Sequence, residues 1–266
     1  MDLAGRTALL TGATGGLGRA IATALAGRGA NLILSSRKAE ALEQMAAELP
    51  GSEHRVVPAD LAEPGAAEQL AAAVDDVDVL VANAGLPATG RLPELSSEEM
   101  VRALRVNLEA PMLLARALEP GMVKRGVGHM VFISSLSGKS ATPLSSVYNA
   151  TKFGLRGFAL GLRADLDPVG VGVSLVSPGT IRDAGMYADS GADPIPGLGT
   201  GSPQQVAAAV LSAIEKNRTE VTVAPIQQRF LAHFALASPA IAVKIASGGA
   251  GQKAAANVAA GQADKR

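Results

Sequence analysis

The stretch "TGATGGLGRAIATALAGRGA", from Thr11 to Ala30, joins a strand-like apolar run to an alanine-rich helical segment. Its glycines follow the spacing GxxxGxG, which differs from the GxGxxG of the best-known dinucleotide-binding turn. The physical need is the same: a turn without Cβ crowding, a backbone close to a pyrophosphate, and a helix N-terminus directed at the charge. A glycine-rich turn that binds nothing has the same composition. The residues predicted to bind phosphate are Gly12, Thr14, Gly15, Gly16, Leu17 and Gly18.

Short apolar runs alternate with helix-like segments on both sides of this turn. Several runs are nearly continuous in Val, Leu and Ile, as expected of parallel strands that are covered on both faces. The alternation predicts an α/β fold, with a single doubly wound Rossmann-type domain over residues 1–225 and helices on both faces of a parallel sheet. The seven runs are "TALLTG", "NLILSS", "HRVVPAD", "DVLVANAG", "HMVFISS", "VSLVSPG" and "EVTVAP".

Local signals mark helix starts and irregular segments. Ser96 with Glu99 has the pattern of a capping box, and so does Ser202 with Gln205, where Pro203 follows at the first helical position. Residues 180–201 are rich in Gly, Asp and Pro, which predicts a long mobile loop beside the substrate. Residues 247–266 are low in complexity and are expected to form a disordered tail.

Composition excludes several classes of function. The 266 residues include 24 Lys and Arg against 24 Asp and Glu, so no basic face for nucleic acid is expected. The absence of cysteine excludes disulfides, thiolate metal sites and thiol nucleophiles. His54, His129 and His233 have no metal-binding spacing, so no metal site is predicted. The start, "MDLAGRTALLTG", lacks the pattern of a signal peptide, which makes the cytoplasm the expected location.

The end of the second predicted strand bears on the choice of dinucleotide. NAD-binding units usually place an acidic residue about 20 residues beyond the glycines, where it accepts from the ribose 2′-hydroxyl. This chain has Ser36 there, followed by Arg37. A small neutral side chain beside a guanidinium suits a 2′-phosphate better, so NADP(H) is the predicted cofactor and NAD(H) remains possible. A solvated basic pair at the start of an exposed helix is the alternative explanation.

Unusual polar residues follow almost every predicted strand. In an open α/β sheet, ligands bind beyond the carboxyl ends of the strands. Each feature alone can be turn chemistry, but their common placement at one edge predicts a cofactor groove. Beyond the glycine turn and Ser36–Arg37, the groove is expected to include Asp60, Leu61, Asn83, Ala84, Gly85, Pro178, Gly179, Thr180 and Ile181, with Ser134–Ser135 at the end of the fifth strand.

The stretch "SSVYNATKFGLRGF", from Ser145 to Phe158, contains one of only two tyrosines in the chain. If it is helical, Tyr148 and Lys152 lie one turn apart on the same face. An ordinary tyrosine pKa of about 10 is too high for efficient acid–base catalysis at neutral pH, and a nearby ammonium lowers it. Ser135 could reach the same substrate oxygen as Tyr148. A Tyr–Lys pair at this spacing also occurs on ordinary helix surfaces.

Taken in order, these motifs resemble those of the short-chain dehydrogenase/reductase family over about residues 5–225. The resemblance implies an NAD(P)(H)-dependent oxidoreductase that interconverts a carbonyl and a primary or secondary alcohol. The matching residues are "TGATGGLG" at 11–18, Asp60, "NAG" at 83–85, Asn107 in "RVNLEAP", "ISS" at 133–135, "YNATK" at 148–152 and "SPG" at 177–179.

The resemblance also implies a role for four catalytic residues. Tyr148 is the proton donor or acceptor, and Lys152 lowers its pKa while holding the nicotinamide ribose. Ser135 orients the substrate oxygen, and Asn107 holds a water that links Lys152 to solvent. A non-catalytic dinucleotide sensor or scaffold on the same fold is the competing hypothesis, although such a protein would not need to keep all four residues.

Further implications concern the cofactor and the assembly. In the family pattern Asp60 contacts the adenine, and Asn83 to Gly85 line the groove. Homo-oligomers form through helices near residues 98–120 and 146–165. The family often has a threonine four residues after the glycine of "SPG", but this chain has Asp183 there. That departure puts the contact to the nicotinamide carboxamide in question.

Residues 226–246, "IQQRFLAHFALASPAIAVKIA", are unusually apolar. His233, Ser238, Pro239 and Lys244 interrupt the run, which falls short of the about 20 apolar residues that span a bilayer. A helix that covers the substrate pocket or forms a subunit contact is the simpler explanation. A peripheral membrane segment that supports reduction of a lipophilic substrate is the second.

Overall fold

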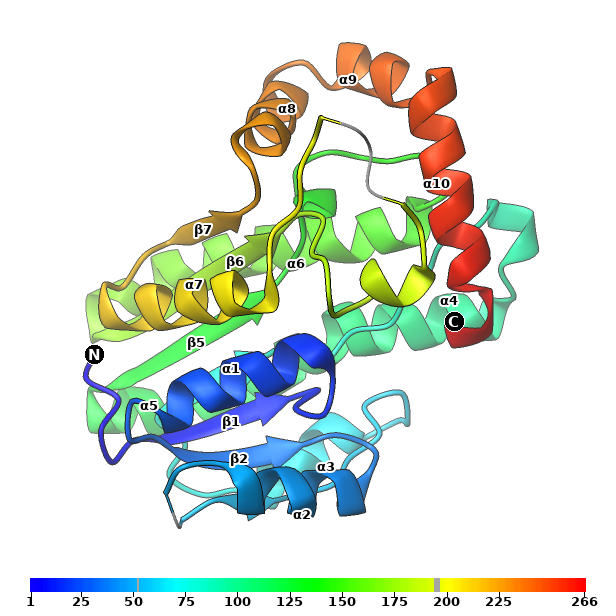
Figure 1. The fold of residues 1–266 in the computed structure, drawn as a ribbon. Helices are drawn as coiled ribbons and strands as arrows, with labels where there is room; N and C mark the ends of the chain where they lie inside the picture. Colours follow the sequence, from blue (N-terminus) through cyan, green and yellow to red (C-terminus); the bar gives the residue numbers. More distant parts are fainter. Residues whose placement is uncertain (52, 194–196) are drawn as a thin grey trace.

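The computed structural model describes residues 1–51, 53–193 and 197–266. In this part of the chain a seven-stranded parallel sheet has the order β3-β2-β1-β4-β5-β6-β7 (Figure 1). The order reverses direction between β1 and β4, so the crevice where ligands bind in such sheets lies beyond these two strands. The predicted fold class is confirmed. The strands are β1 (Thr7–Thr11), β2 (Asn31–Ser35), β3 (Arg55–Val56), β4 (Val79–Ala82), β5 (Gly128–Ile133), β6 (Val171–Pro178) and β7 (Glu220–Val223).

Helices cover both faces of the sheet because alternate strand residues point to opposite faces. In β1, Ala8 and Leu10 pack with α1, α2 and α7, whereas Leu9 packs with α3, α5 and α6. Figure 1 shows α1 and α7 in front of the sheet and α5 and α6 behind it. The helices are α1 (Gly16–Ala26), α2 (Ala39–Glu48), α3 (Ala66–Ala72), α4 (Ser97–Leu104), α5 (Ala110–Arg125), α6 (Ser146–Leu166) and α7 (Pro203–Glu215).

Both predicted capping boxes are present. The Ser96 hydroxyl accepts from the backbone N–H of Glu99, and the Glu99 carboxylate accepts from the N–H of Ser96 at 2.7 Å. Ser202 and Gln205 form the same reciprocal pair at the start of α7, with Pro203 as its first residue. These pairs satisfy N–H groups that a helix start leaves free, so they fix where α4 and α7 begin.

Three helices follow β7: α8 (Ile226–Ala237), α9 (Pro239–Ala246) and α10 (Gly249–Gly261). The disorder expected of residues 247–266 is therefore not what the structure shows. The run of alanines in this tail has high helix propensity. The end of the helix is also held, because the buried Gln262 donates to the Met186 carbonyl at 2.9 Å and accepts from Thr89 Oγ1 at 2.8 Å.

The long loop expected at residues 180–201 is present in its described parts. It contains a short helical turn, Ala188–Ser190, and a bridge that pairs Ile181 with Gly201. Residues 194–196 of this loop lie outside the described residues. The mobility of the loop stays a prediction.

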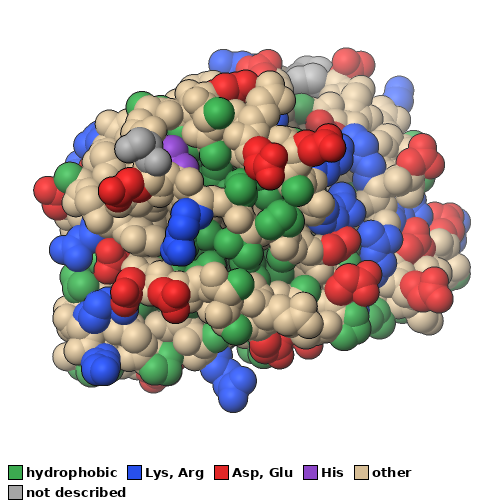
Figure 2. All heavy atoms as spheres, turned by 90° about the horizontal axis from the view of Figure 1, so that it is seen from below, with side chains coloured by type: hydrophobic (Ala, Val, Ile, Leu, Met, Phe, Trp, Pro, Cys, Tyr) green, Lys and Arg blue, Asp and Glu red, His purple; other side chains and the backbone are tan. Residues whose placement is uncertain are grey.

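Charges are well mixed on the lower face of the molecule. Figure 2 shows acidic and basic side chains interspersed over the face seen from below, without a large area of one sign. This agrees with the equal numbers of acidic and basic residues in the sequence.

One buried histidine links two central strands. His129 in β5 is buried, and its Nε2 lies 2.8 Å from Ser174 Oγ in β6. Burial, aided by the positive charges of the N-terminus and Arg163, lowers the pKa of His129 to about 3. The ring is therefore neutral in the folded chain, whereas an unfolded chain takes up a proton near pH 6.5.

This difference predicts that acid weakens the fold. The unfolded state binds more protons than the folded state between about pH 3 and 6.5, so the free energy of unfolding falls as the pH falls through that window. His129 should contribute a loss of about 2 kcal/mol between pH 7 and 5. Urea unfolding of wild type and His129→Gln at both pH values measures it. At pH 7 the variant should have a lower free energy of unfolding than wild type. Between pH 7 and 5 its free energy of unfolding should fall by less than that of wild type, and equal falls would contradict the role assigned to His129.

Candidate active site

The glycine turn after β1 is closely packed against the end of β4. Gly12 has φ +65°, and a Cβ there would lie 2.9 Å from Ala84 Cα and 3.0 Å from Asn83 Nδ2. A Cβ at Gly18 would lie 2.7 Å from the Ala13 carbonyl oxygen. Only glycine fits both positions without a backbone shift. The predicted residues therefore form a tight turn that leads into the N-terminus of α1.

Asn83 braces this turn from the next strand. Its Nδ2 donates to the carbonyls of Thr11 at 3.0 Å and Gly12 at 3.1 Å. In return, Thr11 Oγ1 accepts from the backbone N–H groups of Asn83 and Ala84, both at 3.1 Å. Thr11 is a structural partner that the sequence analysis did not single out. Its signal is a buried hydroxyl at the end of an otherwise aliphatic strand.

The end of β2 offers hydroxyls and a guanidinium. Ser36 Oγ accepts from Thr14 Oγ1 at 3.0 Å, so this hydroxyl lies against the glycine turn. The Lys38 backbone N–H approaches the same oxygen at 3.4 Å. Arg37 is exposed, and no residue in the described part of the chain forms an ion pair with it. The region is thus equipped to receive an anion.

The loops after β3 and β6 reach the same edge. Asp60 Oδ1 accepts from the Ala62 N–H at 3.0 Å, which fixes this carboxylate in a turn of its own, and Leu61 is buried. After β6, the Gly179 N–H donates to the Val223 carbonyl at 3.0 Å. The structure thus brings the predicted groove residues together at the carboxyl ends of the strands.

Tyr148 and Lys152 lie one turn apart near the start of α6, as predicted. Lys152 is buried, and its Nζ lies 5.7 Å from the centroid of the Tyr148 ring. The same Nζ donates to the Ile133 carbonyl at the end of β5, at 3.1 Å. Lys152 therefore lies in the interior, where the end of β5 meets α6, and the half-buried Tyr148 lies above it.

Burial sets the pKa values of this pair. It raises the pKa of Tyr148 to about 12, although hydrogen bonding with Ser135 acts in the opposite direction. It lowers the pKa of Lys152 to about 8. The expectation that Lys152 lowers the pKa of Tyr148 is therefore not met in this structure, where burial has the largest effect and the opposing effect comes from Ser135. At neutral pH Tyr148 keeps its proton and can serve as a donor.

Asn107 connects this pair to the loop after β4. It is buried in a π-helical turn, Arg105–Glu109, of the kind that often marks functional sites. Its Oδ1 accepts from the Leu86 N–H at 2.7 Å, and its Nδ2 donates to the Leu86 carbonyl at 2.8 Å. A Cβ at Gly85 would lie 3.3 Å from Asn107 Oδ1 and 4.0 Å from Lys152 Nζ. Gly85, Asn107 and Lys152 therefore lie close together beyond the end of β4.

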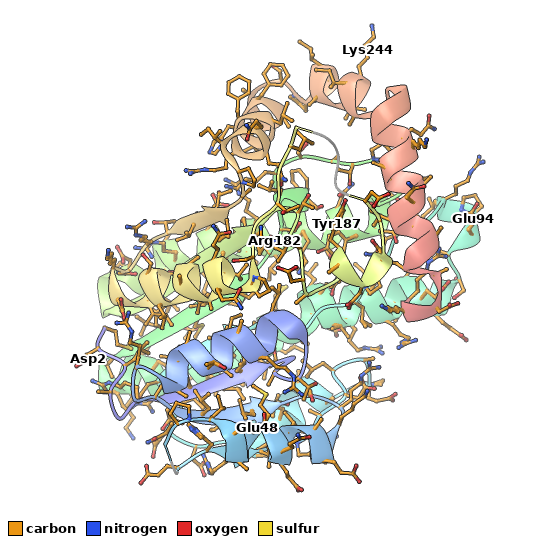
Figure 3. All side chains as sticks on the ribbon, viewed as in Figure 1. Asp2, Glu48, Glu94, Arg182, Tyr187 and Lys244 are labelled. Atoms are coloured by element: carbon orange, nitrogen blue, oxygen red, sulfur yellow. The ribbon has the colours of Figure 1, made fainter. Side chains whose placement is uncertain are left out.

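The loop after β6 lies over this edge. A Cβ at Gly16 would lie 3.3 Å from Ala184 Cα, and one at Gly85 would lie 2.9 Å from Met186 Cε. The segment thus covers both the glycine turn and the Lys152 end of the groove. Figure 3 shows Arg182 and Tyr187 on this loop, between the sheet and α10.

Asp183 stands where the family pattern often has threonine. It is exposed, adopts φ +69°, and its carboxylate lies 3.2 Å from Arg182 Nε. Aspartate tolerates this left-handed conformation better than most residues. The backbone here is thus suited to a turn, and the side chain points to an ion pair on the surface.

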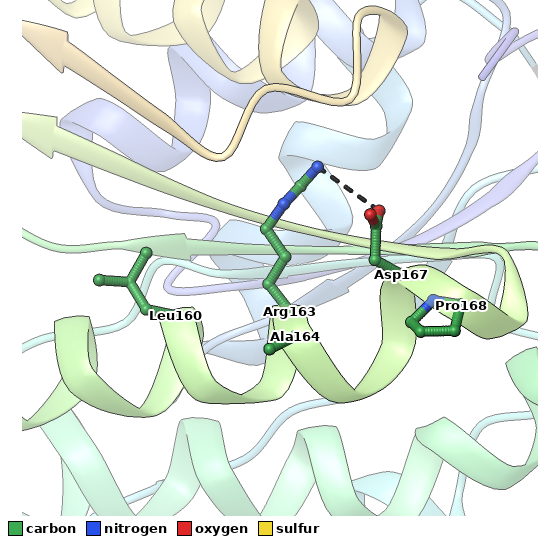
Figure 4. A pocket seen from close by; sticks show the side chains of 5 residues that line it. All are labelled: Leu160, Arg163, Ala164, Asp167 and Pro168. Carbon is green, nitrogen blue, oxygen red and sulfur yellow. Dashed lines mark ion pairs between the residues drawn. The ribbon is translucent and has the colours of Figure 1, made fainter.

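A surface hollow at the far end of α6 belongs to no part of this site. It is lined by Leu160, Arg163, Ala164, Asp167 and Pro168, with an ion pair of 3.6 Å between Arg163 and Asp167 (Figure 4). The helical rise of 1.5 Å per residue places it about 22 Å from Tyr148 along the helix. The hollow is therefore remote from Tyr148 and Lys152, near which the loop after β6 packs against Gly85.

Comparisons with known proteins agree with this geometry. The short chain dehydrogenase family profile matches residues 6–194. The ketoacyl reductase HetN of Nostoc sp. is 37% identical over 227 residues, which cover 83% of this chain and 79% of the relative. Dehydrogenase/reductase SDR family member 7B of Bos taurus is 35% identical over 238 residues, covering 81% of this chain and 72% of the relative.

Solved structures give the same result. A metagenomic short-chain oxidoreductase in complex with NADP is 34% identical and superimposes with a TM-score of 0.72, covering 85% of this chain and 99% of that one. The family profile, the sequence relatives and the fold therefore all indicate the same family. The chain belongs to the short-chain dehydrogenase/reductase family of oxidoreductases.

Proposed function

We propose that this chain interconverts a carbonyl and an alcohol with an NAD(P)(H) cofactor, and that Tyr148 exchanges the proton with the substrate oxygen. The observation that carries the proposal is the pair of half-buried Tyr148 and buried Lys152, with Nζ 5.7 Å from the ring centroid at the carboxyl edge of the sheet. Ser135 lies two residues beyond β5, and its side chain is close enough to Tyr148 to lower the pKa of that hydroxyl. Two groups able to donate to one oxygen are thus side by side.

The residues present fit a dinucleotide. Gly12 and Gly18 leave no room for a Cβ, and this close packing directs the N-terminus of α1 at the groove. Helix N-termini favour anions such as a pyrophosphate. The Ala184–Met186 segment lies against the glycine turn, so we expect it to shift when the groove fills, as loops over active sites commonly do.

The bound nicotinamide would supply the hydride, and the protein residues would control the proton. With a pKa near 12, Tyr148 is protonated at neutral pH and donates to the oxygen that becomes negative during reduction. Ser135 orients that oxygen. The Lys152 ammonium stabilises the tyrosinate that remains, because an opposite charge nearby favours the charged form. Asn107 holds the Leu86 backbone beside this centre; the water it would bind remains a prediction.

The name of one relative suggests which substrate class to assay first. The Nostoc relative is named a ketoacyl reductase, so a ketoacyl compound is the first carbonyl to assay, followed by simple ketones, aldehydes and secondary alcohols. Both cofactors should be tested, with turnover followed by the absorbance of the reduced nicotinamide. Specificity should depend on the loop that carries Met186 and on the segment after Gly85, since these lie over the catalytic pair.

We also propose that the chain forms a homo-oligomer through α4, α5 and α6, as the family resemblance implies. These helices keep large apolar side chains in solvent, which is typical of a surface that a partner covers. The exposed residues are Val101, Leu104, Met112 and Phe153.

Tyr148→Phe should remove the proton donor without disturbing the cofactor site. We expect kcat to fall by about 10²- to 10⁴-fold, while NADPH affinity, measured by nucleotide fluorescence, stays within a few-fold of wild type. Retained turnover would exclude Tyr148 as the acid, and turnover absent from wild type itself would favour the dinucleotide sensor.

Lys152→Ala should lower turnover and also weaken cofactor binding, because the family pattern gives this residue both roles. Lys124→Ala is the matched control, since it removes one lysine near the end of α5 and far from the groove. An effect on turnover alone would show that Lys152 has no part in holding the ribose.

Cofactor choice should depend on Arg37 and Ser36. A charge-assisted contact to the 2′-phosphate contributes about 1.5–3 kcal/mol, or roughly tenfold to a hundredfold in kcat/KM in favour of NADPH. Arg37→Ala should remove most of this preference by weakening NADPH alone, and Ser36→Asp should reverse it through repulsion of the phosphate. Arg28→Ala, at the opposite end of α1, should leave the ratio unchanged. Equal weakening of both cofactors by Arg37→Ala would contradict the assignment.

A further inference from the structure

The helices α8 and α9 expose an unusual apolar surface. Its members share one property: each is a large hydrophobic side chain that stays in solvent. Ile226 is 69% exposed, Phe230 68% and Ile245 59%, values typical of polar residues. We call the α8–α9 apolar surface the two pairs that lie one helical turn apart, Ile226 with Phe230 on α8 and Ile241 with Ile245 on α9. Leu231, Leu236 and Val243 are also exposed, on other sides of the same helices.

The two helices are built with their apolar faces outward. An ordinary surface helix buries its bulky apolar residues and exposes its polar ones. In α8 the buried residues are Gln228, Ala232 and Ala235, and in α9 none is buried. A helix as short as α9 is marginal in water by itself. An exposed patch of this kind marks a surface that a partner covers.

The charged residues of this segment indicate what kind of partner the surface binds. Residues 221–263 contain no Asp or Glu, although acidic residues number 24 in the whole chain. The same segment carries Arg229, Lys244 and Lys253. Figure 3 shows Lys244 projecting outward from α9. A helical segment that combines exposed bulky apolar side chains with basic residues, and has no acidic residue in its sequence, is typical of helices that lie in the interface of an anionic bilayer.

We propose that the α8–α9 apolar surface binds the headgroup region of anionic lipid bilayers. The chain would lie on the membrane and would not cross it. Across the described residues, the helices are either too short or too polar to span a bilayer. Each bulky apolar residue that enters the interface adds favourable transfer free energy, and each basic residue adds attraction to anionic headgroups.

A second copy of the chain fits this surface less well. A two-fold contact would place Arg229 and Lys244 of both copies in one interface, with no acidic residue in residues 221–263 to compensate. The contact expected from the family resemblance lies elsewhere, on α4 to α6, which have their own exposed apolar side chains. The two surfaces are therefore assigned different partners.

The surface is connected to the candidate active site. Gln228 lies on the buried side of α8, and its Oε1 accepts from the Thr180 N–H at 3.1 Å. Its Nε2 donates to the Gly199 carbonyl at 2.8 Å. A bilayer on the outer side of α8 would thus lie near the loop that covers the groove. If the proposed function holds, this arrangement suits a carbonyl on a lipophilic chain; the membrane binding itself does not depend on that activity.

Vesicle flotation of the full chain tests the proposal. One set of vesicles is phosphatidylcholine alone, and the other is an equal mixture of phosphatidylcholine and phosphatidylglycerol, each at low and high salt. Wild type should float with the mixed vesicles at low salt, less at high salt and least with phosphatidylcholine alone. Phe230→Glu and Ile241→Glu should each lower the partition coefficient about tenfold or more. Lys244→Ala should lower it about fivefold on mixed vesicles only.

Val169→Glu is the matched control. Val169 is also an exposed apolar residue, but it follows α6, outside this surface, so its variant should float like wild type. Failure to float with either vesicle would overturn the proposal, and so would equal flotation with both at every salt concentration. A wild-type oligomer that Phe230→Glu dissociates would identify a second copy as the partner and overturn it as well. No readout requires turnover, so these failures are distinct from failure of the proposed function.

Discussion

The close approach of the turns that follow β1 and β4 is the constraint on which the site depends. A Cβ on Gly12 would lie less than 3 Å from Ala84 Cα. Asn83 Nδ2 donates to the carbonyls of Thr11 and Gly12 in the same turn. These two strands are neighbours at the point where the strand order reverses. Their contact fixes the direction of α1 and, through Gly85, the distance between the glycine turn and Lys152. The residues proposed to bind the cofactor and those proposed to act on the substrate are thus positioned by one piece of backbone packing.

Burial gives the Tyr148–Lys152 pair its chemical character. In water the two side chains would titrate near their ordinary pKa values, and a contact between them would contribute little. In the interior both charged forms are penalised, so the pKa of Tyr148 rises and the pKa of Lys152 falls. The tyrosine is held as a neutral donor. Its conjugate base needs the nearby ammonium more than it would in water, since a low dielectric strengthens the attraction.

Much of the fold could be predicted because local and global signals agree. Continuous aliphatic runs, the two capping boxes and the polar residues at the strand ends all indicate the same doubly wound sheet. The predicted site residues lie at the carboxyl edge for the same reason.

Tertiary contacts explain what the sequence could not show. Thr11 matters because of backbone N–H groups from another strand, which no local pattern indicates. The tail after residue 247 is ordered partly through Gln262, whose partners Thr89 and Met186 are remote in sequence. The pKa of Tyr148 depends on how deeply α6 is buried, and helical spacing alone does not reveal that depth.

Two buried glutamines hold the loop over the groove from opposite sides. Gln228 bonds to the backbone at both ends of the loop, at Thr180 and Gly199, and Gln262 bonds to its middle at Met186. Hydrogen bonds of this kind contribute only about 1 kcal/mol each, because water replaces them when they break. These contacts therefore add only a small part of the free energy of unfolding. Gln228 makes its bonds from the inner side of α8, which leaves the apolar outer side of this helix free for a partner.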